Sequence, residues 1–250
     1  MSSTTALRTL LRTPASLRLL LLQTPRSTYH SYDHAEQPVY REAERTILSS
    51  ALAHVPIHGF TQEALTLGAK DAGYLDISSN LFPKGTFDLV KYHLVSQRLG
   101  LKDRIQFPDE NFGVGRKVRN LILERLRANV DTGIVTRWQE ALAIMSLAEN
   151  IPASLRELGA LADEMWFLAG DTAVDASWYT KRASLSGIYA AAEIYQTTDQ
   201  STEYRDTEQF LDRRLEELRT VGGAVSGTLG WAGFQAGAMV NLLRSKGVMI

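Results

Sequence analysis

The sequence contains no cysteine among its 250 residues. Disulfide bonds, thiolate chemistry, iron–sulfur clusters and cysteine-rich zinc sites are therefore excluded. The chain also has almost no net charge, because its 27 lysines and arginines are balanced by 28 aspartates and glutamates. A chain with so little net charge has no overall attraction for nucleic acid, and DNA binding would require a local basic patch.

Recognisable catalytic motifs are also absent. The sequence GVGRKV at 113–118 lacks the third glycine and the preceding strand of a dinucleotide-binding fingerprint, and no P-loop is present. The sequence GAVSG at 223–227 places Ser226 one position away from the serine of a nucleophile elbow. We therefore predict a binding protein with no catalytic residues and no cofactor.

Histidine is scarce, with five residues in the chain. No histidine has a glutamate three residues before it, so the Glu-x-x-His pattern of helical di-iron proteins is missing. His54 and His58 are four residues apart, but we expect Pro56 and Gly59 to break the helix that would bring them together. The pair is predicted to belong to a turn, and no metal site is predicted.

Acidic residues are missing from the first 32 residues, which carry four arginines, many serines and threonines, and leucines at helical spacing. This composition is typical of a mitochondrial presequence. A secretory signal is the alternative, but its apolar core at 19–22 would be only four residues long. We predict that residues 1–34 form a transit peptide outside the fold.

Long runs with alternating polarity are missing, so no strand is predicted. From Val39 onward the apolar residues recur at helical spacing, with glycines and prolines between the periodic segments. The pattern predicts one all-α domain over 38–220, a bundle of about nine to ten helices. The expected helices lie near 39–54, 61–72, 76–82, 85–102, 113–130, 135–149, 154–169, 175–197, 203–220 and 222–245.

Residues 47–82 follow the order of a helix-turn-helix unit, with turns at His58-Gly59 and at Gly73. This segment is similar to the N-terminal part of TetR-type regulators. DNA reading would need cations on the third helix, since phosphate contacts dominate affinity. That helix, YLDISSNLF at 74–82, contains Asp76 and no cation. A ligand-sensing DNA-binding regulator stays as the alternative function, and no nucleic-acid partner is expected.

A series of short motifs along the chain resembles one family. The matching motifs are VPIHGFTQEAL at 55–65, ENIPASL at 149–155, DEMW at 163–166, AGD at 169–171, WYTKR at 178–182 and IY at 188–189. They occur in the order found in the COQ-nine family of mitochondrial ubiquinone-biosynthesis accessory proteins. The resemblance spans roughly residues 40–245, close to the full length.

The resemblance implies a TetR-like helical fold that binds lipid, phospholipid or isoprenoid quinone intermediates, rather than DNA. It also implies a homodimer on the matrix side of the inner mitochondrial membrane that presents substrate to the demethoxyubiquinone hydroxylase. By residue match, Met165, Trp178 and Tyr179 would form a surface patch for lipid and hydroxylase contact, and Arg182 would reach a phospholipid head group. An enzyme of quinone modification is a further alternative, opposed by the missing catalytic motifs.

Periodicity alone gives a compatible interpretation of residues 175–197. Trp178, Arg182, Leu185 and Tyr189 recur along one face of the expected helix, as an apolar stripe with one cation. Such a stripe suits an amphipathic ligand with a phosphate, because arginine binds phosphate well. The alternative is that Trp178 and Tyr189 are ordinary core residues and Arg182 forms an ion pair.

Charged residues are missing between Arg219 and Arg244, and six glycines make this stretch only mildly apolar. We predict an uncharged amphipathic helix over 221–250 that lies in the plane of the membrane. A helix packed on the domain or on a dimer partner is the alternative. The residues expected to meet the membrane are Val225, Leu229, Trp231, Met239, Leu242 and Leu243.

Overall fold

The computed structural model describes residues 39–107, 112–171 and 177–224. The chain divides into two compact units, 1–39 and 40–250, and every described helix belongs to the second unit. Each regular element in the described ranges is helical. The all-α prediction is therefore confirmed, and the arrangement agrees with a TetR-like helical bundle.

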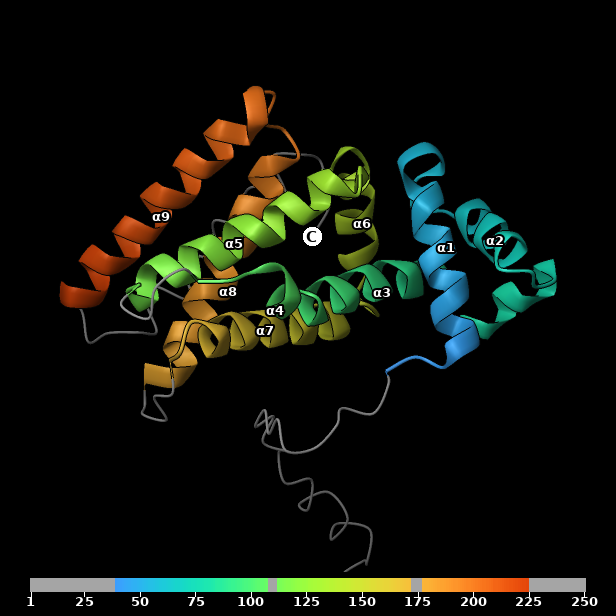
Figure 1. Ribbon diagram of the computed structural model, residues 1–250, viewed down its shortest axis with the longest axis horizontal. Helices are drawn as coiled ribbons and strands as arrows, with labels where there is room; N and C mark the ends of the chain where they lie inside the picture. Colours follow the sequence, from blue (N-terminus) through green and yellow to red (C-terminus); the bar gives the residue numbers. More distant parts are fainter. Residues whose placement is uncertain (1–38, 108–111, 172–176, 225–250) are drawn as a thin grey trace, which may run out of the picture. The chain divides into compact units, whose positions relative to one another are not determined.

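The described residues form nine α-helices and three 3-10 helices. The α-helices are α1 (Glu42–His58), α2 (Gln62–Asp71), α3 (Thr86–Leu99), α4 (Leu101–Arg104), α5 (Val114–Asp131), α6 (Trp138–Met145), α7 (Ile151–Leu168), α8 (Ser177–Gln196) and α9 (Arg205–Ala224). The 3-10 helices are η2 (Asp76–Leu81), η3 (Ile134–Arg137) and η4 (Thr202–Tyr204). Within residues 40–224, α1 and α2 lie at one end of the bundle and α9 at the other (Figure 1).

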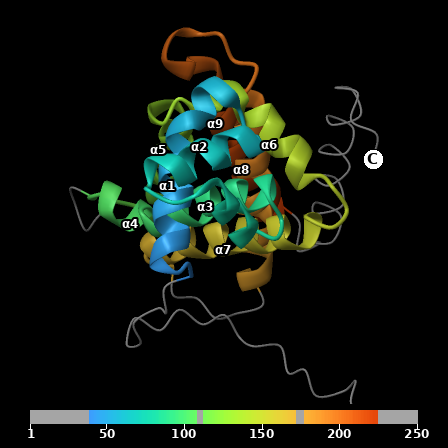
Figure 2. The same ribbon diagram turned by 90° about the vertical axis from the view of Figure 1, so that its right-hand side faces the viewer.

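The unit of α1, α2 and η2 has the order expected of a helix-turn-helix. Thr61 caps α2, because its side chain accepts a hydrogen bond from the backbone nitrogen of Ala64 at 3.3 Å. α1 and α2 approach so closely that a Cβ atom on Gly68 would lie 2.4 Å from the backbone nitrogen of Ala51. Figure 2 views the bundle from this end. The core here includes Ile47, Leu48, Val55, Phe60, Leu65, Leu89, Ile134 and Trp138.

Pro56 was expected to break the helix that contains His54, and this expectation is wrong. Pro56 lies inside α1, which continues to His58 and ends at Gly59, where φ is 70°. Only three residues of α1 include or follow Pro56, so few helical hydrogen bonds are lost. Pro152 lies in the first turn of α7, where its missing N–H would have no helical partner in any case.

Because α1 continues, His54 and His58 share one helix after all. Their ring centroids are 6.1 Å apart. His54 Nε2 contacts Asp71 Oδ2 at 2.6 Å, and His58 Nδ1 lies 3.4 Å from Glu63 Oε1. No group of three or more metal-ligating side chains with suitable geometry occurs among the described residues. The two histidines therefore join α1 to α2 through separate carboxylates.

The element in the position of a recognition helix is η2, and it carries no lysine or arginine. Its apolar side chains point outward: Leu75 just before it is 77% exposed and Ile77 is 70% exposed. The surface that a regulator would use to contact phosphates is apolar here.

A second core fills the space between α5, α7, α8 and α9. Arg119 on α5 ties α9 in place, because its Nε donates to Asp212 at 2.5 Å and its Nη2 to Glu208 at 2.6 Å. α9 continues to Ala224, so the boundary predicted at 220 falls inside this helix. In the part of the chain that the structure describes, no helix is long and apolar enough to span a membrane. The core residues here include Leu101, Val118, Leu121, Ile122, Leu126, Leu161, Met165, Leu185, Ile188, Tyr189 and Leu211.

Candidate functional site

Aromatic rings and cations at the start of α8 contact each other and side chains of α7. The guanidinium carbon of Arg182 lies 3.8 Å from the centre of the Trp178 ring, and Arg182 Nε donates to Asp163 on α7. Both partners of this ion pair are nearly buried. A cation stacked on tryptophan and paired with a carboxylate fixes the first turn of α8 against α7.

Lys181, the residue before Arg182, is also held by a carboxylate and an aromatic ring of α7 and its C-terminal end. Lys181 Nζ lies 3.2 Å from both carboxylate oxygens of Asp171 and 5.7 Å from the centre of the Trp166 ring. The indole nitrogen of Trp166 donates to the backbone oxygen of Lys181 at 3.1 Å. Both cations of the WYTKR motif therefore have carboxylate partners within this chain.

The ring of Tyr179 projects away from this structure. Its side chain is 76% exposed, and it meets the half-buried ring of Trp178 edge to face at 4.7 Å between centroids. Phe167 near the end of α7 is also exposed. An exposed tyrosine on a rigid aromatic and cationic support is typical of a protein contact surface.

The other predicted site residues line the interior. Met165, Leu185 and Tyr189 are buried where α7 packs against α8, and the space that they border is too small to hold a water molecule. Ordinary ligand pockets have volumes of roughly 300–1,000 Å³, so no such pocket is open here. A lipid would fit only if α7 and α8 moved apart. The remaining lining residues are Leu158, Leu161, Ala162 and Ser186.

One expectation about these residues needs correction. Met165 is 0% exposed, so it does not lie on a surface patch with Tyr179. It faces the core together with Leu161 and Ala162, the other buried apolar residues of α7. The alternative interpretation of the stripe describes Tyr189 and Arg182 correctly, since Tyr189 is core and Arg182 forms an ion pair.

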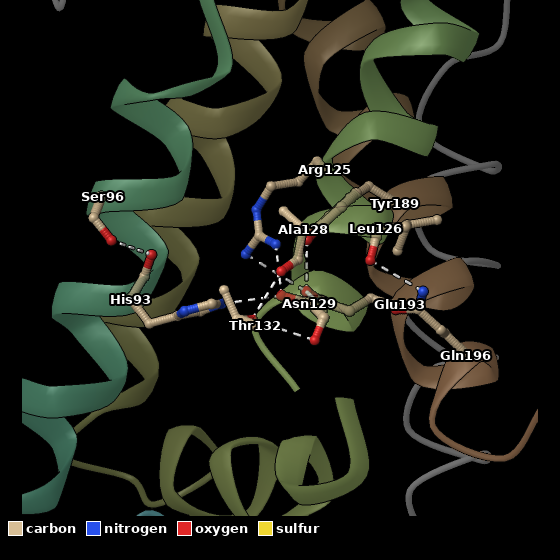
Figure 3. A network of polar contacts seen from close by, with 10 residues as sticks. All are labelled: His93, Ser96, Arg125, Leu126, Ala128, Asn129, Thr132, Tyr189, Glu193 and Gln196. Carbon is tan, nitrogen blue, oxygen red and sulfur yellow. Dashed lines mark hydrogen bonds and ion pairs between the residues drawn. The ribbon is translucent and has the colours of Figure 1, made fainter. Parts of the chain in front are cut away.

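A polar network lies beside this space, between α3, α5 and α8 (Figure 3). The hydroxyl of Tyr189 donates to Glu193 Oε1 at 2.5 Å. Asn129 Nδ2 donates to the same carboxylate at 3.0 Å, and Asn129 Oδ1 accepts from Arg125 Nη1 at 2.7 Å. His93 Nε2 lies 3.0 Å from Asn129 Oδ1. The network therefore connects three helices through one central asparagine.

Burial sets the protonation states in the network. It raises the pKa of Tyr189 well above its usual value, and the nearby Glu193 adds to this effect. Burial, followed by the charge of Arg125, lowers the pKa of His93 to about 3. His93 is therefore neutral near pH 7. Because Asn129 Oδ1 can only accept, His93 must donate from Nε2 and carry its free lone pair on Nδ1.

Sequence reasoning missed this network, although a signal was present. On α5, Arg125 and Asn129 continue the stripe of Val118, Leu121 and Ile122 that faces the core. A cation and an amide on the apolar face of a helix indicate an interior polar cluster. The predicted residues Val225, Leu229, Trp231, Met239, Leu242 and Leu243 lie outside the described residues.

Comparison with known proteins identifies the family. A family model described as COQ9 matches residues 151–222, which contain α7, α8 and most of α9. The protein named ubiquinone biosynthesis protein coq9, mitochondrial, of Schizosaccharomyces pombe is 35% identical over 226 residues, covering 89% of this chain and 88% of the relative. The chain belongs to the COQ9 family.

A vertebrate COQ9 protein gives the same result. Ubiquinone biosynthesis protein COQ9-B, mitochondrial, of Xenopus laevis is 32% identical over 210 residues, covering 80% of this chain and 71% of the relative. The resemblance carried by the motifs DEMW, AGD and WYTKR is therefore confirmed. These COQ9 motifs form the end of α7 and the start of α8, where rings and cations interlock.

Proposed function

We propose that this protein is a lipid-binding accessory protein of ubiquinone biosynthesis without catalysis of its own. It binds isoprenoid quinone intermediates or phospholipid at the inner mitochondrial membrane, on the matrix side. It presents the substrate to the demethoxyubiquinone hydroxylase. The names of its COQ9 relatives support the pathway and the mitochondrial location.

The observation that carries this proposal is the position of the WYTKR segment. Its exposed Tyr179 offers a contact surface for the hydroxylase, and Leu185, further along α8, lies in the apolar interior with Met165. A partner on that surface would bind near the space between α7 and α8 that a lipid would occupy. Arg182 at the same turn would contact an anionic head group.

Two further parts of the proposal concern assembly. Residues 221–250 act as an in-plane membrane helix, because the stretch before Arg244 is amphipathic and uncharged, and Arg244 and Lys246 can meet anionic head groups. The protein acts as a homodimer, as the family resemblance implies. The membrane helix keeps the chain on a surface where isoprenoid lipids are dissolved.

Lipid binding is tested by mass spectrometry of the organic extract of purified protein, residues 35–250. We expect isoprenoid quinone or phospholipid in near-stoichiometric amount. Ala162→Met fills the space between α7 and α8 and should reduce the bound lipid severalfold. Ala141→Met makes the same substitution in the other core and should leave the lipid in place. Extracts of the unaltered protein with neither lipid class would refute the proposal.

A further inference from the structure

Four large apolar side chains gather in the segment that follows α2. Tyr74, Leu75, Ile77 and Leu81 are all exposed, and none of the six residues of η2 is buried. Single exposed apolar residues are common on soluble proteins, but a cluster of large ones marks a surface that binds something. We call these four residues the apolar tip. The tip belongs to the end of the bundle that α1 and α2 form, away from α9 (Figure 1).

The apolar tip is held in place at both of its ends. The chain leaves α2 at Gly73, where φ is 79°, and the backbone nitrogen of Tyr74 donates to the oxygen of Ala69 at 2.8 Å. This hydrogen bond is typical of a Schellman motif. At the other end, Phe82 is buried in the core that α1, α2 and α3 share. The exposure of the tip is therefore set by well-packed neighbours.

Charge does not explain what the apolar tip would bind. Residues 70–84 contain two lysines and two aspartates, so the segment has no net charge. Residues three apart share a face in a 3-10 helix, which places Asp76 and Ser79 on one face and Ile77 on another. The hydroxyl of Ser79 donates to the backbone oxygen of Asp76 at 2.9 Å on that polar face. A partner of the tip must therefore be recognised through apolar contact.

We propose that the apolar tip inserts into the surface of a lipid bilayer, as a membrane contact separate from residues 221–250. Leu75, Ile77 and Leu81 enter the upper part of the acyl chains, and Asp76 stays at the level of the head groups. This assignment rests on the proposed location of the protein at a membrane, and it specifies which described residues meet that surface.

The size of the apolar tip favours a bilayer over a protein partner. A stable interface between two proteins buries about 800 Å² on each side and involves about 20–30 residues of each partner. The tip contains four residues, and a second copy of the chain would add only four more. A bilayer sets no such threshold, because binding grows with each apolar group that leaves water. Three aliphatic side chains are enough for a measurable contribution.

The position of the tip also predicts how the bundle lies on the membrane. α9, which precedes the predicted membrane helix, lies at the end of the bundle opposite to α1 and α2 (Figure 1). Contacts at both ends place the long direction of the bundle along the bilayer surface. A single contact after α9 would leave the unit of α1, α2 and η2 free to point away from it.

The lack of cysteine allows one reporter group to be placed on the apolar tip. Ile77→Cys in the full chain is labelled with an environment-sensitive fluorophore and mixed with phosphatidylcholine vesicles. We expect a blue shift of the emission, and quenching by lipids brominated in the upper acyl chain. Arg127→Cys is the matched control, because Arg127 on α5 is also exposed. Its label should show neither change.

A second measurement compares vesicle affinities by sedimentation. The double variant Leu75→Ser with Ile77→Ser should bind phosphatidylcholine vesicles at least about tenfold more weakly than the unaltered chain, because two apolar side chains no longer leave water. The control, Leu147→Ser with Leu155→Ser, also removes two exposed leucines and should bind within about twofold of the unaltered chain. Salt at about 1 M, which screens charges within about 3 Å, should not reduce the difference between the variants.

The outcomes separate this proposal from the proposed function. Vesicle binding by the unaltered chain with no spectral change at Ile77→Cys, or with equal affinity of the tip variant, would overturn the insertion of the tip and leave the membrane location intact. A spectral change with the hydroxylase in place of vesicles would identify the tip as a protein contact and overturn the insertion as well. Failure of the unaltered chain to bind any vesicle would overturn both.

Discussion

Tyr179 allows partner binding to be separated from stability. Its side chain is 76% exposed, so Tyr179→Ala removes little buried area and should change the free energy of unfolding by about 0.5 kcal/mol or less. A tyrosine buried at the centre of a protein interface contributes about 2 kcal/mol, which corresponds to roughly 30-fold in the dissociation constant. We therefore expect a large loss of hydroxylase binding from a fully folded variant.

The measurement is titration calorimetry of purified Tyr179→Ala with the demethoxyubiquinone hydroxylase, combined with urea unfolding of the variant alone. Tyr74→Ala is the control, because Tyr74 is also exposed but lies by η2, in the unit formed with α1 and α2. Binding within about twofold of the unaltered protein would refute the partner surface. An equal loss in Tyr74→Ala would show that the effect is not specific to α8.

Three further predictions concern other parts of the chain. Gly68→Ala should destabilise the protein by about 1–3 kcal/mol in urea unfolding, because the new methyl group would meet the backbone of Ala51 at 2.4 Å; unchanged stability would mean that α1 and α2 are not so close. Since burial lowers the pKa of His93 to about 3 from 6.5, His93 binds a proton below pH 6.5 in the unfolded chain but stays neutral in the folded chain. The contribution of neutral His93 to the free energy of unfolding is complete above pH 6.5. It is lost as the pH falls toward 3, by about 1.4 kcal/mol per pH unit. His93→Gln should flatten this slope in unfolding measurements between pH 4.5 and 6, and an unchanged slope would contradict it. Deleting residues 222–250 should abolish flotation with liposomes, and unchanged flotation would exclude the membrane role.

Local patterns predicted the helices well where the helix ends are set by local chemistry. Residues 113–130 were expected to form one helix, and α5 spans Val114–Asp131. The end of α7 at Gly170 was also expected, and this glycine adopts a φ of 86°, which other residues rarely tolerate. The error at Pro56 arose because a proline can lie within one turn of a helix end without the loss of many hydrogen bonds.

The site was only partly predictable, because its decisive contacts join residues far apart in the chain. The sequence identified Trp178 and Arg182 as neighbours on one face, but Asp163, which pairs with Arg182, lies on another helix. Arg125 and Glu193 lie on α5 and α8 and meet only in the folded core. Periodicity reports which face of a helix is buried and says nothing about which helix covers it.

The ion pair between Arg182 and Asp163 would make the proposed head-group position an exchange site. An anionic head group would have to displace the Asp163 carboxylate from Arg182, whose guanidinium stacks on Trp178. A doubly charged phosphate competes for the guanidinium more strongly than a singly charged group, and a neutral ring does not compete at all. Occupancy of this position should therefore fall as salt screens the incoming phosphate, while the internal pair, shielded between two helices, persists.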